Sequence, residues 1–146
     1  MATELLVTLL SDTARLPRKM YHNDAGIDLF SDEEGEIGPY ENKKISTGIA
    51  VAIPKGHCLV IKDRSGIATK TRCCVVAGVI DEQYRGPIIV AFENHGGEHI
   101  PLRRGDRIAQ ALLLPVPEVD IVEVPELPET DRGENGFGST DEASAS

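Results

Sequence analysis

The stretch "AGVIDEQYRG" places several reactive and polar groups just before an apolar run. The carboxylate of Asp81 can accept a proton from water or anchor a hydroxyl group. The ring of Tyr84 can pack flat against a sugar, and Gly78 allows a ligand to come close to the backbone. The alternative is that these are ordinary turn residues, and this stretch alone does not decide between the two interpretations.

Three other short stretches carry groups that can serve an anionic ligand. "RSGIATK" sets Arg64, Ser65 and Gly66 in succession, and a guanidinium, a hydroxyl and exposed backbone N–H groups all bind phosphate oxygens. "DAGIDLFS" contains Asp28, which could also be a solvated or capping acid. "GDRIAQ" puts Gln110 at the start of an apolar run, where a hairpin turn followed by a strand is the simpler explanation.

The C-terminal stretch "VPELPETDRGENGFGSTDEASAS" is rich in Pro, Gly, Ser and acidic residues, a composition typical of a disordered tail. Within it, Arg132 and the aromatic Phe137 precede Gly138, Ser139 and Thr140. A mobile arm with a base, a stacking ring and two hydroxyls is suited to folding over a nucleotide.

The elements that must position these groups are predicted to be short strands. Gly and Pro turn signals recur about every eight to twelve residues, which favours an all-β barrel or sandwich. "HCLVIK", "IIVAF" and "VDIVEV" are predicted strands, and "KKISTGIAVAI" puts one apolar face at period two. That face consists of Ile45, Thr47, Ile49, Val51 and Ile53. Only "ATKTRCC" and "DRIAQALLL" could also form helices.

A chain of 146 residues fits one core. We predict a β domain over residues 1–124 and a flexible acidic arm over 125–146. The first residues lack the basic start and unbroken apolar stretch of a secretory signal, and no apolar run approaches the roughly 20 residues that span a bilayer. A soluble protein of the cytoplasm or nucleus, without a membrane partner, is therefore expected.

The net charge of -9 is concentrated at the C-terminal end. From Glu118 onward there are nine acids and one base, giving -8, and the fifteen acids and fourteen bases up to Pro117 give -1. No basic stripe suited to nucleic acid is present. An anionic ligand must therefore be met by a few placed bases, backbone N–H groups or a cation.

The three cysteines do not have the spacing of a metal site or a disulfide framework. Cys73 and Cys74 are adjacent and would point to opposite faces of a strand, and Cys58 is the third. Free thiols in a reducing compartment are expected.

Five stretches occur in a fixed order between residues 25 and 140: "AGIDLFS", "RSGIATK", "AGVIDEQYRG", "GDRIAQ" and "RGENGFGST". In this ordered set the chain resembles the trimeric dUTP pyrophosphatases (dUTPases). The resemblance implies a jelly-roll-like β-barrel or sandwich with a flexible arm, assembled as a homotrimer with active sites at subunit interfaces. It implies Mg2+-dependent hydrolysis of dUTP to dUMP and diphosphate, which keeps dUTP low and supplies dUMP for thymidylate synthesis.

The resemblance also implies a role for each site residue. Asp81 would activate the water that attacks the α-phosphorus, while Asp28 and Gln110 would hold waters bound to phosphate or metal. Gly78 and the neighbouring backbone would bind uracil, and Tyr84 would pack on the deoxyribose and exclude a 2′-hydroxyl. No protein group would bind Mg2+ directly, since the ion would be held through substrate phosphates and waters.

The remaining implied contacts involve the phosphates and the arm. Arg132 would meet the γ-phosphate, Phe137 would stack on uracil, and Ser65 would lie near the α,β bridge. The other implied phosphate contacts are Arg64, Gly66, Gly138, Ser139 and Thr140.

Four positions depart from the family pattern: Asp63, Gln83, Asn135 and Asp141. Asp63 could compete for Arg64, and the two changes in the arm could slow its closure or weaken phosphate binding. None of the four removes a group with an implied chemical role, so an active enzyme is expected.

Two other functions are compatible with the same fold. A related deaminase would act on dCTP and would need a further acid–base group near the pyrimidine, for which Glu82 is the nearby candidate. A non-catalytic regulatory binding module would have no need of Asp81, Tyr84, Ser65 and Arg132, all of which are present.

Overall fold

The computed structural model describes residues 3–66, 71–76 and 78–138, and within them the chain forms ten strands. One four-stranded sheet has the order β1 (Leu6–Leu9), β4 (Asn42–Ala52), β8 (Pro87–Asn94), β6 (Cys73–Val75). The second has the order β2 (Gly26–Phe30), β10 (Arg107–Pro115), β5 (His57–Lys62), β7 (Val79–Ile80). A two-stranded ribbon joins β3 (Gly35–Ile37) to β9 (Ile100–Leu102).

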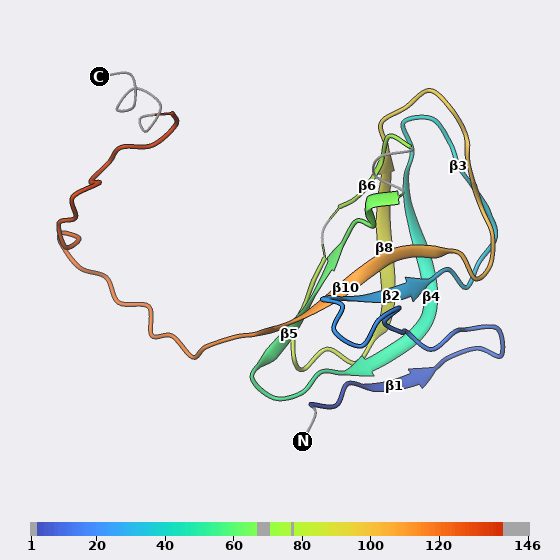
Figure 1. The fold of residues 1–146 in the computed structure, drawn as a ribbon, viewed down its shortest axis with the longest axis horizontal. Coiled ribbons are helices and arrows are strands. Elements are labelled where there is room, and N and C mark those ends of the chain that lie inside the picture. Colours follow the sequence, from blue (N-terminus) through green and yellow to red (C-terminus); the bar gives the residue numbers. More distant parts are fainter. Residues whose placement is uncertain (1–2, 67–70, 77, 139–146) are drawn as a thin grey trace.

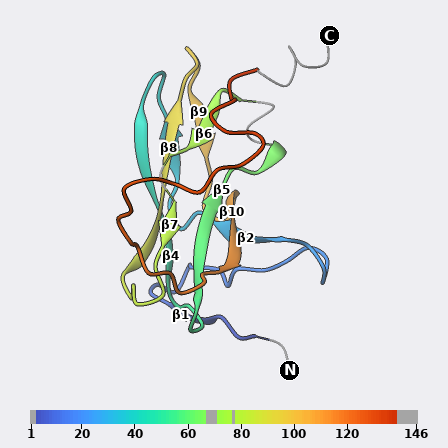
Figure 2. The same ribbon diagram turned by 90° about the vertical axis from the view of Figure 1, so that its left-hand side faces the viewer.

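The two large sheets lie side by side as two layers (Figure 2), and every strand pair is antiparallel. Their facing side chains form one core, to which β4 and β8 contribute from one sheet and β2, β5 and β10 from the other. The expected jelly-roll-like all-β fold is confirmed. Fully burying a branched side chain contributes about 1.5–3 kcal/mol, so such a core can hold the site rigidly.

The period-two prediction for β4 is confirmed, because its five predicted inward residues are all buried. They are Ile45, Thr47, Ile49 and Val51 of β4 and Ile53, which directly follows the end of β4. The one polar member, Thr47, donates its hydroxyl hydrogen bond to the carbonyl of Ile88 at 2.6 Å. The Thr47 hydroxyl therefore has a hydrogen-bond partner inside the core.

A carboxylate fastens the N-terminal segment to the start of the β2–β3 connection. Asp32 accepts hydrogen bonds from the hydroxyls of Ser11 at 2.6 Å and Thr13 at 2.7 Å. Gly48, in β4 with a φ of 67°, is required beside it, since a Cβ there would lie 2.6 Å from the Asp32 carboxylate. The hydrogen bond from Ser11, and then that from Thr13, holds the pKa of Asp32 below its usual value.

Replacing Asp32 by Asn should lower the free energy of unfolding at pH 7 by about 1 kcal/mol, since the charge on both hydrogen bonds is lost and the amide oxygen can accept only one of them. A carboxyl group whose folded-state pKa is lowered stabilises the fold above its unfolded-state pKa. That contribution is lost as the pH falls through the folded-state value, so the gap between the two proteins should close at strongly acidic pH. Unfolding in denaturant over a pH series measures it. The neighbouring exposed acid serves as control: Glu34→Gln should have little effect, and an equal loss there would contradict the assignment.

Two further strand predictions are confirmed, and one of the two ambiguities between helix and strand is resolved. "HCLVIK" forms β5, "IIVAF" lies in β8, and "DRIAQALLL" forms β10 rather than a helix. Of "ATKTRCC", residues 68–70 lie outside the described residues, and Cys73 and Cys74 belong to β6.

The predicted strand "VDIVEV" is wrong for the single chain. After β10 ends at Pro115, the described residues 116–138 form no strand and run away from the β body (Figure 1). A strand needs a neighbour whose backbone groups pair with its own, and residues 119–124 have no strand partner among the described residues. The proposed boundary between residues 124 and 125 stays a prediction. Among the described residues, no helix has the length and apolar character needed to cross a membrane.

Candidate active site

The polar stretch identified in the sequence forms a tight turn between β7 and β8. Asp81 directly follows β7, and its carbonyl accepts a hydrogen bond from the backbone N–H of Tyr84 at 3.1 Å. The Tyr84 hydroxyl donates to the carbonyl of Pro87 at 2.9 Å, which fixes the ring. The Arg85 guanidinium donates to the carbonyls of Glu82 at 2.7 Å and Tyr84 at 3.0 Å. The turn is therefore held by its own side chains.

Gly78 is required for the packing of this hairpin. Its carbonyl accepts a hydrogen bond from the N–H of Ile61 in β5 at 2.7 Å, and a Cβ at Gly78 would lie 2.7 Å from the Ile61 carbonyl oxygen. No side chain fits there without moving the backbone. The glycine thus positions the hairpin on β5, whether or not a ligand also approaches it.

The hairpin encloses a hollow of about 210 Å³ lined by apolar side chains, Asp81 and Tyr84. The full lining is Val79, Ile80, Asp81, Tyr84, Pro87, Ile88 and Ile89. One water occupies about 30 Å³, so the space suits a small ring rather than a large ligand. A single carboxylate beside an apolar hollow and an aromatic ring can orient a water or a hydroxyl next to a bound ring.

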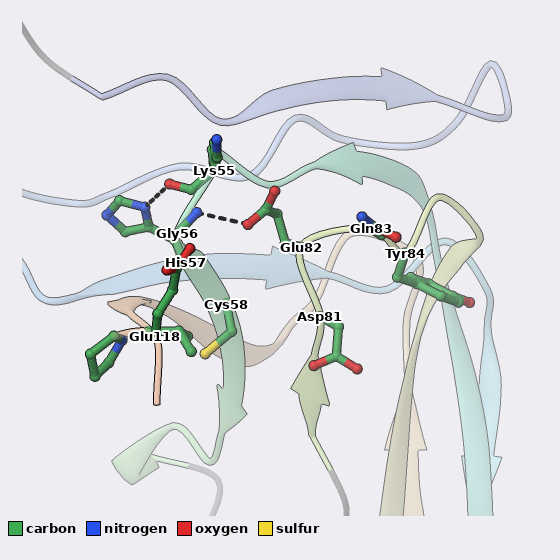
Figure 3. A pocket seen from close by; sticks show the side chains of 11 residues that line it. Lys55, Gly56, His57, Cys58, Asp81, Glu82, Gln83, Tyr84 and Glu118 are labelled. Atoms are coloured by element: carbon green, nitrogen blue, oxygen red, sulfur yellow. Dashed lines mark hydrogen bonds between the residues drawn. The ribbon is translucent and has the colours of Figure 1, made fainter. Parts of the chain in front are cut away.

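The next residue, Glu82, lies on the other side of the turn. Figure 3 shows its side chain directed toward Gly56, whereas that of Asp81 points the opposite way. The Glu82 carboxylate accepts a hydrogen bond from the Gly56 N–H at 2.7 Å. A second cavity, of about 670 Å³, lies there and extends to Glu118, and Asp81 and Tyr84 also belong to its lining. Of the two adjacent acids, only Asp81 lines the smaller hollow as well.

Apart from Gly66 and the residues of the arm, the predicted phosphate residues gather in a pocket of about 340 Å³ at the other edge of the same sheet. Its lining includes Asp28, Arg64, Ser65, Arg107 and Gln110. The mostly buried Asp28 carboxylate lies 3.2 Å from Nε of Arg64 and 3.7 Å from a guanidinium nitrogen of Arg107. The pocket therefore presents two guanidinium groups held by one shared carboxylate. Guanidinium groups fixed in this way can bind phosphate oxygens.

The surroundings of Asp63 support this pocket. Its carboxylate accepts a hydrogen bond from the Val75 N–H at 2.5 Å, and its carbonyl accepts one from the Gln110 side-chain amide at 2.8 Å. Among the described residues, Arg64 pairs with Asp28, so the anticipated competition from Asp63 is not observed. A Cβ added at Gly66 would meet nothing within 4 Å, which leaves its backbone open to a ligand.

The hairpin and the phosphate pocket do not meet within one chain. Asp28 is on β2 and Asp81 follows β7, and these strands are the two edges of the sheet β2-β10-β5-β7. Three strand spacings separate them, about 14 Å across the sheet. The two hollows share no lining residue.

The predicted arm residues lie far along the extended C-terminal segment. Arg132 donates from Nε to the Asn135 carbonyl at 2.8 Å, and Phe137 is fully exposed with a φ of 49°. A left-handed conformation costs a non-glycine residue roughly 1–2 kcal/mol, and an exposed phenyl ring gains nothing from its own chain. Gly138 follows with a φ of 91°. The other predicted arm residues lie outside the described residues, namely Ser139, Thr140 and the departure at Asp141.

Comparison with known proteins gives the family. The family model described as dUTPase matches residues 12–141. This chain belongs to the dUTPase family. The matched range contains all five ordered stretches, so the resemblance predicted from the sequence is confirmed.

Individual dUTPases match over almost the full length. The deoxyuridine 5′-triphosphate nucleotidohydrolase of Clostridium tetani is 41% identical over 138 residues, covering 93% of this chain and 95% of the relative. A mutant dUTPase of Staphylococcus bacteriophage 80alpha, solved with dUpNHpp, has a TM-score of 0.88 and 30% identity, covering 95% and 99% of the two chains. A mutant dUTPase of phage phi11 of S. aureus, solved with a structural Mg(II) ion, has a TM-score of 0.81 and 29% identity, covering 87% and 100%.

One pocket residue of this dUTPase family member was not predicted. Arg107 lies three positions before Gln110, and regular alternation would place the two on opposite faces of β10. The pairing of β10 with β2 shifts register between Arg107 and Ala109. This irregularity brings Arg107 and Gln110 to the same pocket. The single base in "GDRIAQ" is the available signal, but the bulge itself leaves no pattern in the sequence.

Proposed function

We propose that this member of the dUTPase family hydrolyses dUTP to dUMP and diphosphate by attack of water at the α-phosphorus. The observation that carries the proposal is the position of Asp81, whose carboxylate lies beside Tyr84 at the hollow inside the hairpin. The phage 80alpha relative was solved with dUpNHpp, which supports a deoxyuridine nucleotide as the ligand. The activity would keep dUTP low and supply dUMP in the cytoplasm or nucleus.

The hairpin would bind the nucleoside half of the substrate. Uracil would enter the hollow and pair with backbone groups near Gly78. The Tyr84 ring, fixed by its hydrogen bond to Pro87, would form a wall against the deoxyribose. A fixed ring leaves no room to adjust for a 2′-hydroxyl, so ribonucleotides would be disfavoured. Asp81 would then accept the proton of the attacking water.

The pocket between β2 and β10 would bind the triphosphate. Arg64 and Arg107 would meet phosphate oxygens, held in place by Asp28. Ser65 and the open backbone at Gly66 would contact the bridge where charge develops on the leaving diphosphate. Fixed donors of this kind stabilise the transition state without reorganising during the reaction.

Mg2+ would be held by the substrate phosphates and by waters, and the residues of the pocket fit this arrangement. The Asp28 carboxylate already faces two guanidinium groups. In the described ranges, no trio of acidic, His or Cys ligands lines this pocket. When bound, the ion would offset part of the charge of the triphosphate. Asp28 and Gln110 would orient its waters.

We further propose a homotrimer whose active sites combine different copies of the chain. Asp81 and Arg64 lie on opposite edges of one sheet, so a copy could supply the hairpin to the phosphate pocket of its neighbour. Beyond β10 the apolar side chains of Val119, Ile121 and Leu127 are 78%, 96% and 83% exposed. A soluble protein rarely leaves such a row uncovered, which supports packing of this segment on another copy. The arm residues, including Arg132 and Phe137, would then reach a site formed by two other copies.

The surroundings of Glu82 do not favour the alternative activity on dCTP. A deaminase would need this carboxylate near the pyrimidine. Glu82 instead accepts a hydrogen bond from the Gly56 N–H and is directed away from the hollow that contains Asp81 (Figure 3).

A diphosphate-release assay across dUTP, dTTP, UTP and dCTP tests the proposal. Release from dUTP should exceed that from each of the others by at least about a hundredfold, because the hollow and the Tyr84 wall select both base and sugar. Chelating Mg2+ should lower the rate with dUTP. Ammonia release from dCTP would favour the deaminase, and no release from any of the four would favour the non-catalytic binding module.

A further inference from the structure

A second set of chemically active side chains lies outside the proposed active site. Cys74, Glu93 and His95 offer a sulfur, a carboxylate oxygen and an imidazole nitrogen that all lie within 4.8 Å of one another. Sγ of Cys74 is 3.2 Å from Nε2 of His95, and that nitrogen is 3.4 Å from a carboxylate oxygen of Glu93. None of these residues lines the hairpin hollow or the phosphate pocket.

The sheet itself brings the three groups together. Cys74 of β6 is the direct partner of Glu93 on β8, so their side chains stand on the same face. His95 is two residues beyond Glu93 and therefore returns to that face. Its backbone N–H donates to the Arg72 carbonyl at 2.7 Å, which holds the residue in place just beyond the end of β8. The cluster is thus set by strand register rather than by a mobile loop.

The spacing of these atoms is close to that of ligands around one tetrahedral cation. With Zn–S near 2.3 Å and Zn–N and Zn–O near 2.0–2.1 Å, the S–N separation is about 3.6 Å and the N–O separation about 3.3 Å. The sulfur of Cys74 lies 3.2 Å and the carboxylate oxygen of Glu93 lies 3.4 Å from Nε2 of His95, so a small shift of these side chains would admit the ion. We propose that Cys74, Glu93 and His95 bind Zn2+ or a similar borderline-soft divalent ion, with water as the fourth ligand.

A neighbouring residue supports the carboxylate ligand. The side-chain amide of Asn42 lies 3.5 Å from Oε1 of Glu93, while the other oxygen, Oε2, faces His95. Partners behind the ligands orient them and commonly change metal affinity by about 10–100-fold.

The donor set distinguishes this ion from the Mg2+ expected on the triphosphate. Sulfur and imidazole ligands favour zinc-like ions, whereas Mg2+ prefers oxygen ligands. The alternative use of a Cys–His pair is as a nucleophile, which requires a thiol of lowered pKa. The Glu93 carboxylate lies within 4.8 Å of the Cys74 sulfur. A negative group so close to the sulfur favours a cation between the two.

Binding would join β6 to β8 at the edge of the first sheet. Val75, next to Cys74, is held by Asp63, whose carbonyl in turn accepts the hydrogen bond of Gln110 in the phosphate pocket. The ion would therefore brace the strand that follows the Arg64 segment. Its expected effect is on stability rather than on the chemical step.

Titration of the metal-free full-length chain with Co2+ tests the site. One Co2+ per chain should bind with a thiolate-to-metal charge-transfer band, and Zn2+ should displace it and raise the unfolding temperature. Cys74→Ser should abolish the band, and His95→Gln and Glu93→Gln should each weaken binding by at least about tenfold. Cys58→Ser is the matched control, since this half-buried thiol lies outside the cluster.

The readouts do not depend on dUTP hydrolysis, so they stand apart from the test of the proposed function. Absence of a bound ion, a band that survives Cys74→Ser, or tighter binding of Mg2+ than of Zn2+ would each overturn the proposal. Circular dichroism of each variant separates loss of the site from loss of the fold. If Cys74→Ser does not fold, the two other substitutions still decide the question through Zn2+ affinity.

Discussion

Replacing Asp81 by Asn is expected to reduce kcat for dUTP by about 10²–10⁴-fold while leaving dUTP affinity nearly unchanged. The amide has the shape of the carboxylate but cannot take a proton from water. The uracil hollow and the phosphate pocket keep their other groups, so substrate still binds. Single-turnover kinetics and equilibrium binding of dUTP measure the two effects separately.

The adjacent acid provides a matched control. Glu82→Gln makes the same chemical change one residue further along the turn, where the carboxylate accepts the Gly56 N–H and is directed away from Asp81. Its kcat should stay within a few-fold of the unchanged protein. A near-normal turnover of Asp81→Asn, or an equal loss in both variants, would remove the assigned role of Asp81.

The same variant can show whether one site uses two chains. Asp81→Asn and Arg64→Ala trimers should both be nearly inactive alone. If Asp81 of one copy serves the phosphate pocket of its neighbour, unfolding and refolding an equal mixture restores about one quarter of the sites, by random assortment in a cyclic trimer. If each copy carried a complete site, every site in the mixture would lack one group and no activity would return.

The strands were predictable because burial leaves a clear period in the sequence. The inward face alternates from Ile45 in β4 to Ile53 directly after it, and those residues are buried as expected. The segment "VDIVEV" has the same character, yet it forms no strand within the chain. The apolar pattern of a sequence indicates which side chains are buried in the native protein, but it does not identify the surface that covers them. For this segment we propose that the surface belongs to another copy.

The side-chain arrangement was less predictable where it depends on register. Arg107 joins the phosphate pocket through an irregularity in β10, and alternation alone would have placed it elsewhere. Cys74 looked like an isolated thiol because its neighbours Glu93 and His95 are about twenty residues away and meet it only across β6 and β8. Gly78 is predicted to let a ligand approach the backbone, and the structure adds a packing requirement against Ile61 that the sequence does not indicate. Each case needs the pairing of two strands, which one sequence does not contain.

Deleting residues 132–146 should leave the β body folded with the same oligomeric state and reduce kcat/KM for dUTP by at least about a hundredfold, because the arm's positioning and exclusion of water are lost. The hydrogen bonds made by described residues 130–138 all lie within the arm, so this part of the arm gives the core no hydrogen-bonded support. The unfolding temperature should therefore be unchanged.

The composition of the arm explains why so large an effect is expected from an exposed segment. The C-terminal segment carries nine acids after Pro117, yet its end is proposed to cover a negatively charged triphosphate. Between Arg132 and Thr140 there is one acid, Glu134, so the part expected to cover the triphosphate is nearly free of repelling charge.

A chain ending at Thr140 is the matched control and should retain activity, while Phe137→Ala should show part of the loss. Steady-state kinetics measures kcat/KM for dUTP, and light scattering measures the oligomeric state. Full activity after deletion of residues 132–146 would contradict the proposed role of Phe137 and the arm in covering the substrate.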